Sequence, residues 1–111
     1  MKIYHITKNN DWQRAVAENT YRGDTLASEG FIHCSTTEQV LEVANRRFRG
    51  QPGLVLLVID EEKVLPHIKY ENLEGGTQLF PHIYGPLNLN AVLFVVPFEP
   101  GLDGSFSKWV E

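Results

Sequence analysis

The stretch LVLLVID, from Leu54 to Asp60, decides the fold predicted for this chain. It holds six apolar residues in a row, and a strand points successive side chains to opposite faces of its sheet. A run that is apolar on both faces predicts a central strand covered on both sides. A second apolar run, AVLFVVPF from Ala91 to Phe98, predicts the strand that closes the sheet. The alternating segment from His67 to Glu71 predicts a half-exposed neighbour of the central strand.

Two helices and two short strands are expected before this central strand. The opening KIYHIT predicts a strand, and Asn10 precedes a helix over residues 11–17. Residues 31–34 predict a second strand, and Thr36-Thr37-Glu38-Gln39 has the capping-box form that begins a second helix. The order β-α-β-α followed by several strands predicts an α+β fold with a mostly antiparallel or mixed sheet and two main helices.

Composition limits the classes of protein to consider. The 111 residues carry ten lysines and arginines against fourteen acidic residues, a net charge of −4, and we expect one domain with a core over about 2–98 and a tail over 99–111. The single cysteine, Cys34, excludes an intrachain disulfide and fits a reducing cytoplasm. The polar opening and the short apolar runs predict neither export nor a membrane partner. A pI near 5.5 argues against bulk nucleic-acid binding.

Two histidines are predicted to share a cleft. If the first two strands pair, the simplest packing buries Tyr4 and Ile6 against Ile32 and Cys34, which leaves the histidines of both strands on the opposite face. These are His5 and His33. A strand histidine can equally be a half-buried residue held by hydrogen bonds, and both interpretations stay open.

The segment from Ser28 to Thr36 gathers an acid, an imidazole, a thiol and several hydroxyls just before a helix. The N-terminus of a helix binds anions, so we expect Ser35 and Thr36 to hold a phosphate or carboxylate. One of the two is also expected to be the N-cap of the helix, and the two roles are compatible. The arginines at the end of that helix complement its dipole, although they leave room for one small anionic ligand.

Aromatic side chains mark the segment from Leu79 to Leu87. In an extended segment Phe80, His82 and Tyr84 share one face, and two prolines stiffen the backbone around them. Such a face suits a wall that stacks a heterocycle, and it equally describes an edge strand packed on a core. Glu29 and Glu71 are the acids that we consider for acid–base chemistry.

Two further interpretations come from other classes of protein. The histidines His5, His33 and His82 are in principle enough for a zinc site, but they lack the short spacing of such sites, and no metal is expected. The aromatic tail, with Phe106 and Trp109, would serve a non-enzymatic module by docking a partner protein.

The motifs SEGFIHCST and LFPHIYGPL, with the opening IYHIT, resemble those of a bacterial and plant family, the domain of unknown function numbered nine-five-two. That family is thought to be a distant relative of the ADP-ribosyltransferase superfamily, which includes NAD-dependent toxins and RNA 2′-phosphotransferases. The resemblance implies a split, curved sheet and NAD as the ligand. It also implies that His5 bonds the adenosine ribose and that residues 33–36 line the nicotinamide side. The arginines that would hold phosphate are not assigned by the resemblance, and Arg22 and Arg46 are candidates. The segment from Leu79 to Tyr84 departs from the superfamily because it lacks a catalytic glutamate.

The resulting hypothesis is a cleft that binds NAD or an ADP-ribose-like nucleotide. An enzyme of this kind would be an NAD-dependent ADP-ribosyl transferase or a phosphotransferase, and the alternative is a non-enzymatic binding or interaction module. The residues expected to contact the ligand are His5, Ser35, Thr36, Phe80 and Tyr84. The residues expected to supply acid–base contacts are His33, His82 and Glu29.

Overall fold

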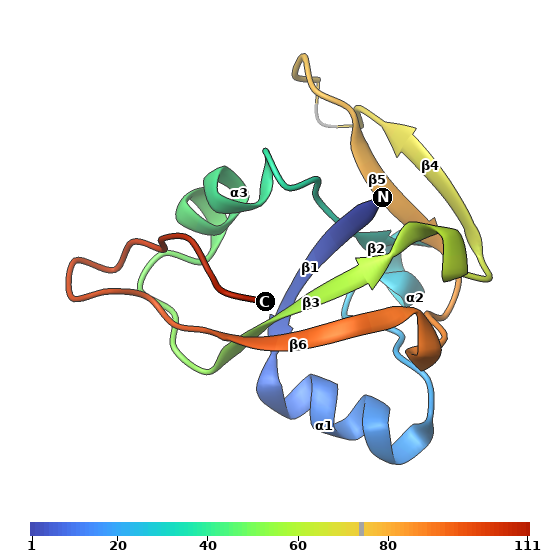
Figure 1. Ribbon diagram of the computed structural model, residues 1–111. Coiled ribbons are helices and arrows are strands. Elements are labelled where there is room, and N and C mark those ends of the chain that lie inside the picture. Colours follow the sequence, from blue (N-terminus) through green and yellow to red (C-terminus); the bar gives the residue numbers. More distant parts are fainter. Residues whose placement is uncertain (74) are drawn as a thin grey trace.

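The computed structural model describes residues 1–73 and 75–111. In the described residues two three-stranded sheets lie beside one another, with helices around them (Figure 1). Each pair of neighbouring strands is antiparallel. The α+β prediction is confirmed. Of the two predicted kinds of sheet, antiparallel and mixed, the structure has the antiparallel one. The strands are β1 (Lys2–Lys8), β2 (Ile32–His33), β3 (Leu54–Asp60), β4 (His67–Glu71), β5 (Phe80–Tyr84) and β6 (Val92–Phe98). The helices are α1 (Asn9–Glu18), α2 (Leu26–Glu29) and α3 (Val40–Arg47), with one-turn 3-10 helices at Glu61–Lys63 and Leu89–Ala91.

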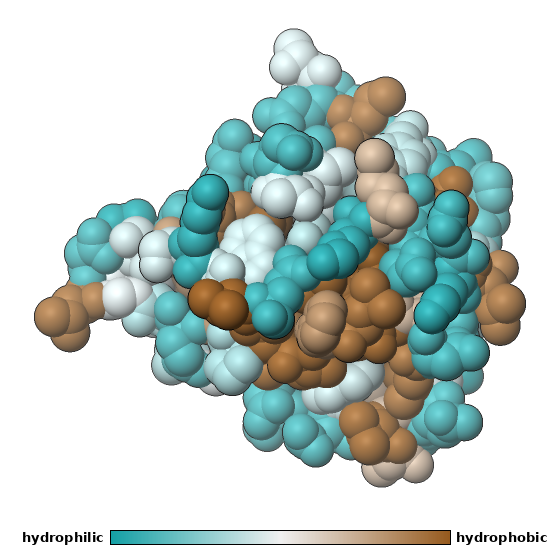
Figure 2. Space-filling model, viewed as in Figure 1, coloured by the Kyte–Doolittle hydropathy of each residue, from teal (hydrophilic) through white to brown (hydrophobic). Residues whose placement is uncertain are grey.

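The first sheet has the order β1-β3-β6, with β3 in the centre as predicted. The first six residues of β3 are buried, because both faces of the sheet are covered. Strand β6 forms one edge, and Figure 2 shows apolar surface over it. Its exposed apolar residues are Leu93, Phe94 and Val95.

The second sheet has the order β2-β5-β4. The segment from His67 to Glu71 is a half-exposed strand as predicted, but its neighbour is β5 and not β3. The chain leaves β3 through a 3-10 turn and reaches Pro66, which cannot donate to a strand ladder, before β4 begins. The polar strand therefore pairs away from the buried sheet.

Two hydrophobic cores lie on opposite faces of the first sheet. One core packs the sheet against α1 and the second sheet, and includes Ile3, Trp12, Ile32, Leu57 and Ile83. The other packs the sheet against α3 and the C-terminal segment, and includes Tyr4, Ile6, Leu56, Val40 and Phe106. This double coverage explains why β3 is apolar along its whole length.

Strand β1 also meets the chain just after β2. Tyr4 and Ser35 exchange two backbone hydrogen bonds of 2.8 Å, so the first two strand segments are neighbours as expected. With Tyr4 opposite Ser35, however, Cys34 lies on the other side from Tyr4. Cys34 and Ile32 belong to the core that contains α1, while Tyr4 and Ile6 belong to the core that contains α3. The predicted packing of these pairs is therefore wrong, because a shift of one residue in register exchanges the two faces.

Helix α3 begins at Val40 with Gln39 as its N-cap, because residues 37–39 form a turn before it; the prediction that Ser35 or Thr36 is the N-cap is therefore wrong, and only one half of the capping box forms. The side-chain oxygen of Gln39 accepts a hydrogen bond of 3.0 Å from the backbone N–H of Thr36, and the carbonyl of Thr36 accepts from the N–H of Val40. The short helix α2 was not predicted, because it lies in a segment rich in turn residues.

The C-terminal tail is packed on the first sheet. Phe106 is buried and stacks on Phe98 with ring centroids 4.8 Å apart, and its backbone exchanges two hydrogen bonds with the side chain of Asn45. Trp109 packs edge-on against Tyr4 at 5.2 Å. The tail aromatics that would dock a partner protein are therefore occupied within the chain.

Two remaining expectations concern membranes and one turn. Within the described ranges, none of the helices combines the length and hydropathy that crossing a bilayer requires. The sequence Glu74-Gly75-Gly76-Thr77 predicts a glycine turn, and its first residue, Glu74, lies outside the described residues.

Candidate functional site

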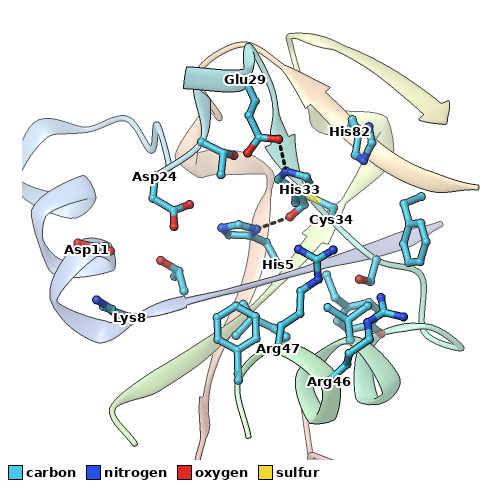
Figure 3. Close-up of a pocket in the computed structure, with 18 of the residues that line it drawn as sticks. His5, Lys8, Asp11, Asp24, Glu29, His33, Cys34, Arg46, Arg47 and His82 are labelled. Atoms are coloured by element: carbon cyan, nitrogen blue, oxygen red, sulfur yellow. Dashed lines mark hydrogen bonds and ion pairs between the residues drawn. The ribbon is translucent and has the colours of Figure 1, made fainter. Parts of the chain in front are cut away.

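A cavity of about 280 Å³ opens between β1, the chain around β2, and the C-terminal half of α3 (Figure 3). Its floor is formed by strand residues that include His5 and Ser35, and charged side chains from the helices and loops surround it. The charged lining residues are Lys8, Asp11, Asp24, Glu29, Arg46 and Arg47. Several types of polar group therefore converge on one concave site.

His5 is buried and both of its ring nitrogens have partners. Nδ1 lies 2.5 Å from the carbonyl oxygen of His33, and Nε2 lies 2.6 Å from the hydroxyl of Tyr21. A carbonyl only accepts, so Nδ1 carries a proton and donates it. Burial lowers the pKa of His5 below its ordinary value, which favours the neutral ring. Nε2 is hydrogen-bonded to the hydroxyl of Tyr21. His5 is therefore a buried, hydrogen-bonded strand residue that lines the cavity, and the prediction that it shares a face with His33 is wrong because the residue opposite Ser35 in the register is Tyr4 and not His5.

His33 and His82 are cross-strand partners on β2 and β5. Their ring centroids are 5.2 Å apart, and both residues line the cavity. Nε2 of His33 lies 3.2 Å from a carboxylate oxygen of Glu29, which lies four residues earlier in the chain. His33 is half-buried and Glu29 is exposed, so this acid–imidazole pair can meet a ligand and solvent together.

His82 is held more tightly than His33. Its Nδ1 lies 3.0 Å from Oε1 of Glu71, and the same oxygen accepts a hydrogen bond from the hydroxyl of Tyr84. The bonds from Tyr84 and then from His82 lower the pKa of Glu71 below its usual value. The imidazole also stacks on Phe31, with centroids 4.2 Å apart and planes inclined by 23°. Glu71 and Phe31 thus fix the orientation of one cavity-lining histidine.

The cationic wall of the cavity comes from the last turn of α3. Figure 3 shows the guanidinium groups of Arg46 and Arg47 rising from this helix towards the strands that carry His5 and His33. Arg46 also lies 3.7 Å from Glu42, in a surface pair that is worth little in water. Two guanidinium groups beside a partly enclosed space suit a phosphate or carboxylate.

Carboxylates stand on the other side of the cavity, together with the amine of Lys8 beside Asp11 (Figure 3). Asp11 belongs to α1 and Asp24 to the loop that follows it, and Figure 3 shows both beyond His5 from the arginines. The charge of Asp24 acts on His5 and opposes the effect of burial on its pKa. Carboxylates accept hydrogen bonds from hydroxyl groups, so this side of the cavity suits a sugar.

The structure brings six of the eight sequence-predicted site residues to the cavity. These are His5, Glu29, His33, Ser35, Phe80 and His82. Thr36 is not among the lining residues, and its backbone N–H donates to the side-chain oxygen of Gln39. Tyr84 is not among them either, because its hydroxyl is bonded to Glu71.

Some lining residues were candidates from the sequence, and others were not. Arg46 was one of the two candidate phosphate ligands and lines the cavity, whereas Arg22 lines a second cavity. Asp11 and Asp24 come from separate segments and have no motif that links them. Arg47 follows Arg46 directly, and that arginine cluster was the available signal.

The thiol of Cys34 takes no visible part in this chemistry. The residue is 3% exposed and lies in the core, and burial raises the pKa of its thiol far above the usual range. Among residues 1–73 and 75–111, no group of three or more histidine, cysteine or acidic side chains has an arrangement that would hold a metal ion.

Comparison with known proteins places the chain in a family. The model of the family described as "Protein of unknown function (DUF952)" matches residues 6–95. The crystal structure of protein CC0527 from Caulobacter crescentus is similar with a TM-score of 0.87 and 34% identity, over 96% of this chain and 94% of that one. The solution structure of the same protein gives a TM-score of 0.81 and 35% identity, over 94% and 90% of the two chains. No curated protein matches the chain. The chain belongs to the DUF952 family of proteins of unknown function.

Proposed function

We propose that this protein binds the phosphorylated ribose of a nucleotide, with NAD or ADP-ribose as the ligand class. The observation that carries the proposal is the opposition of charges across the cavity, where Arg46 and Arg47 face Asp11 and Asp24. Guanidinium groups bind phosphate oxygens in pairs, and carboxylates accept hydrogen bonds from ribose hydroxyls. A ribose phosphate carries both chemistries within one small group.

The size of the cavity fits one nucleotide-sized part of such a ligand. Its volume of about 280 Å³ lies just below the range of small-molecule sites, which run from about 300 to 1,000 Å³. Phe48 and Phe80 give the lining its apolar ring surface, and Ser35 adds a hydroxyl. Because both nitrogens of His5 are already bonded, His5 would shape the wall and would not donate to the ribose.

A transferase reaction is the second candidate, and the Glu29–His33 pair favours it. The carboxylate lies 3.2 Å from the imidazole at the edge of the cavity, where it would stabilise positive charge on a bound ribose. NAD bound in the cavity would supply a ribose with a nicotinamide leaving group. A non-enzymatic binding protein would use the same cavity without releasing nicotinamide, so chromatographic detection of nicotinamide separates the two functions.

Titration calorimetry tests the binding proposal. ADP-ribose, NAD and ribose 5-phosphate are titrated into the protein, with inorganic phosphate as the minimal anion. The double variant Arg46→Gln/Arg47→Gln should bind ADP-ribose about tenfold more weakly or worse, as the loss of charged hydrogen bonds predicts. The matched control is Arg49→Gln, because Arg49 does not line the cavity and bonds the carbonyl of Asp103 at 3.4 Å. Absence of binding by every nucleotide, or equal affinity in the double variant, would overturn the proposal.

A further inference from the structure

The second sheet has an apolar face and a polar face, and the polar face forms part of the cavity wall. His33 and His82 are opposite each other on β2 and β5, and Ser35 lies two residues beyond His33. Side chains alternate along an extended chain, so these three share a face, while Ile32 and Ile83 belong to the core on the other side. All three polar residues line the cavity.

The two ring nitrogens of His82 have different surroundings. Nδ1 lies 3.0 Å from a carboxylate oxygen of Glu71, and a carboxylate only accepts, so in the neutral ring Nδ1 carries the proton and Nε2 keeps a lone pair. Nε2 has no hydrogen-bond partner among residues 1–73 and 75–111, although the side chain is only 5% exposed. In the described chain no fully buried side-chain nitrogen or oxygen lacks a partner, so Nε2 opens to the cavity that His82 lines.

Ser35 is the second buried polar side chain of this wall. The residue is 5% exposed. Its backbone N–H and carbonyl bond to Tyr4, whereas its hydroxyl has no partner within the described ranges and opens to the cavity for the same reason. Ser35 is diagonal to His82 in the strand register. Such residues have Cα atoms about 7 to 8 Å apart and side chains that lie closer, which leaves room for one ligand oxygen between them.

A hydroxyl group complements these two atoms. It donates its proton to Nε2 of His82, and its oxygen accepts from the hydroxyl of Ser35. A phosphate oxygen without a proton has nothing to donate to Nε2, so the phosphate of a ligand belongs beside the guanidinium groups of Arg46 and Arg47.

We propose that Ser35 and His82 form a subsite for one hydroxyl group of the ligand's ribose, and that Glu71 is the positioning residue that turns Nε2 towards it. The inference rests on the proposed function, because the ribose enters the cavity with the phosphate that Arg46 and Arg47 hold. It goes beyond that function by naming the residues that distinguish a ribose from a deoxyribose.

The experiment compares adenosine 5′-monophosphate with its 2′-deoxy and 3′-deoxy analogues by titration calorimetry. At least one analogue should bind about tenfold more weakly to the wild type, because it leaves a buried polar group unpaired. His82→Phe keeps a ring that can stack on Phe31, and it should bind the monophosphate and that analogue within about twofold of each other. The matched control is His67→Phe, which should keep the tenfold difference, because His67 is exposed on β4 and does not line the cavity.

Glu71 and Ser35 are tested by the same comparison. Glu71→Ala should reduce the difference between the two ligands, whereas Glu71→Gln should retain it, because an amide oxygen still accepts from Nδ1. Ser35→Ala should reduce the difference too, and this smaller change keeps the test available if His82→Phe does not fold. Nitrogen-15 NMR of the free protein should show the His82 proton on Nδ1. A proton on Nε2 alone would overturn the proposal.

The remaining failures are distinguishable. If the monophosphate binds through Arg46 and Arg47 but neither analogue binds more weakly, the hydroxyl subsite is overturned and the proposed function stands. The same holds if the difference persists in both His82→Phe and Ser35→Ala, or if it is lost only in Asp24→Asn. If none of the nucleotides binds, the proposed function fails and the subsite fails with it. Thermal unfolding of each variant shows whether the fold is intact.

Discussion

The ring of His5 donates from Nδ1 to the carbonyl oxygen of His33, and this hydrogen bond joins β1 to β2 across the two sheets. Its Nε2 is bonded to Tyr21, whose hydroxyl is bonded in turn to Thr7 at 2.9 Å. Because His5 holds this buried network together, its first role is structural. The floor of the cavity is thus set by a histidine with no ring nitrogen left for a ligand.

Replacing His5 should therefore destabilise the protein. We expect His5→Ala to cost about 3 kcal/mol in the free energy of unfolding, because it leaves a buried cavity and unpaired polar groups. His33→Ala should cost under about 1 kcal/mol, because the bond uses the backbone of His33 and its half-buried ring is easily replaced by water. Urea denaturation measures both, and equal costs would contradict the structural role of His5.

The stability of the protein should fall below neutral pH because of the same residue. The folded pKa of His5 lies below its ordinary value of 6.5, so the unfolded chain takes up a proton before the folded chain does. The stabilisation is complete above pH 6.5 and is lost as the pH falls towards the folded pKa. Urea titrations at pH 7.5 and 5.5 should show a smaller loss in His5→Gln than in the wild type. Identical losses would exclude His5 as the source.

Glu71 should add a second pH dependence at lower pH. Hydrogen bonds from Tyr84 and His82 hold its pKa below 4.5, so its stabilisation is present above pH 4.5 and is lost as the pH falls through the folded value. Between pH 6 and pH 3, the melting temperature of Glu71→Gln should fall by less than that of the wild type. The fall for Tyr84→Phe should lie between these two values, because this variant removes the hydrogen bond that lowers the pKa of Glu71 most and keeps the one from His82. A wild-type pH profile in Glu71→Gln would refute this assignment.

The C-terminal tail should behave as part of the fold. Phe106 is buried against Phe98, so Phe106→Ala should cost about 3 kcal/mol. Val110 is 87% exposed, and Val110→Ala should change stability by less than about 0.5 kcal/mol. If chemical denaturation shows no loss in Phe106→Ala, the tail is loosely attached and its aromatic residues are free to dock a partner.

Much of the fold could be predicted because several segments carry their own signal. The run from Leu54 to Ile59 is apolar on both faces, and this identified the central strand. The capping-box sequence Thr36-Thr37-Glu38-Gln39 indicated that a helix follows, although the helix begins at Val40, after a turn, and not at the box itself. Pairing between distant segments is set by tertiary contacts instead. The register of Tyr4 with Ser35 and the pairing of β4 with β5 therefore differed from the predictions, since no local pattern determines them.

The candidate site shows the same division. The histidines could be found from the alternation of side chains on strands, but the histidine opposite His33 is His82 and not the predicted His5. The carboxylates of Asp11 and Asp24 could not be found, because they are brought to the cavity by the packing of α1 and its loop. The arginines were visible in the sequence, but the direction in which a helix end points depends on the tertiary structure.

The most direct test of the account is a titration of the amide NMR spectrum with ADP-ribose, with inorganic phosphate as the reference anion. We predict saturable shifts at the amides that surround the cavity, namely those of Asp24, His33, Ser35, Arg46 and Arg47, and no shifts along β6. The contradictory result is an unchanged spectrum at millimolar ADP-ribose, or shifts confined to the exposed apolar residues Leu93, Phe94 and Val95.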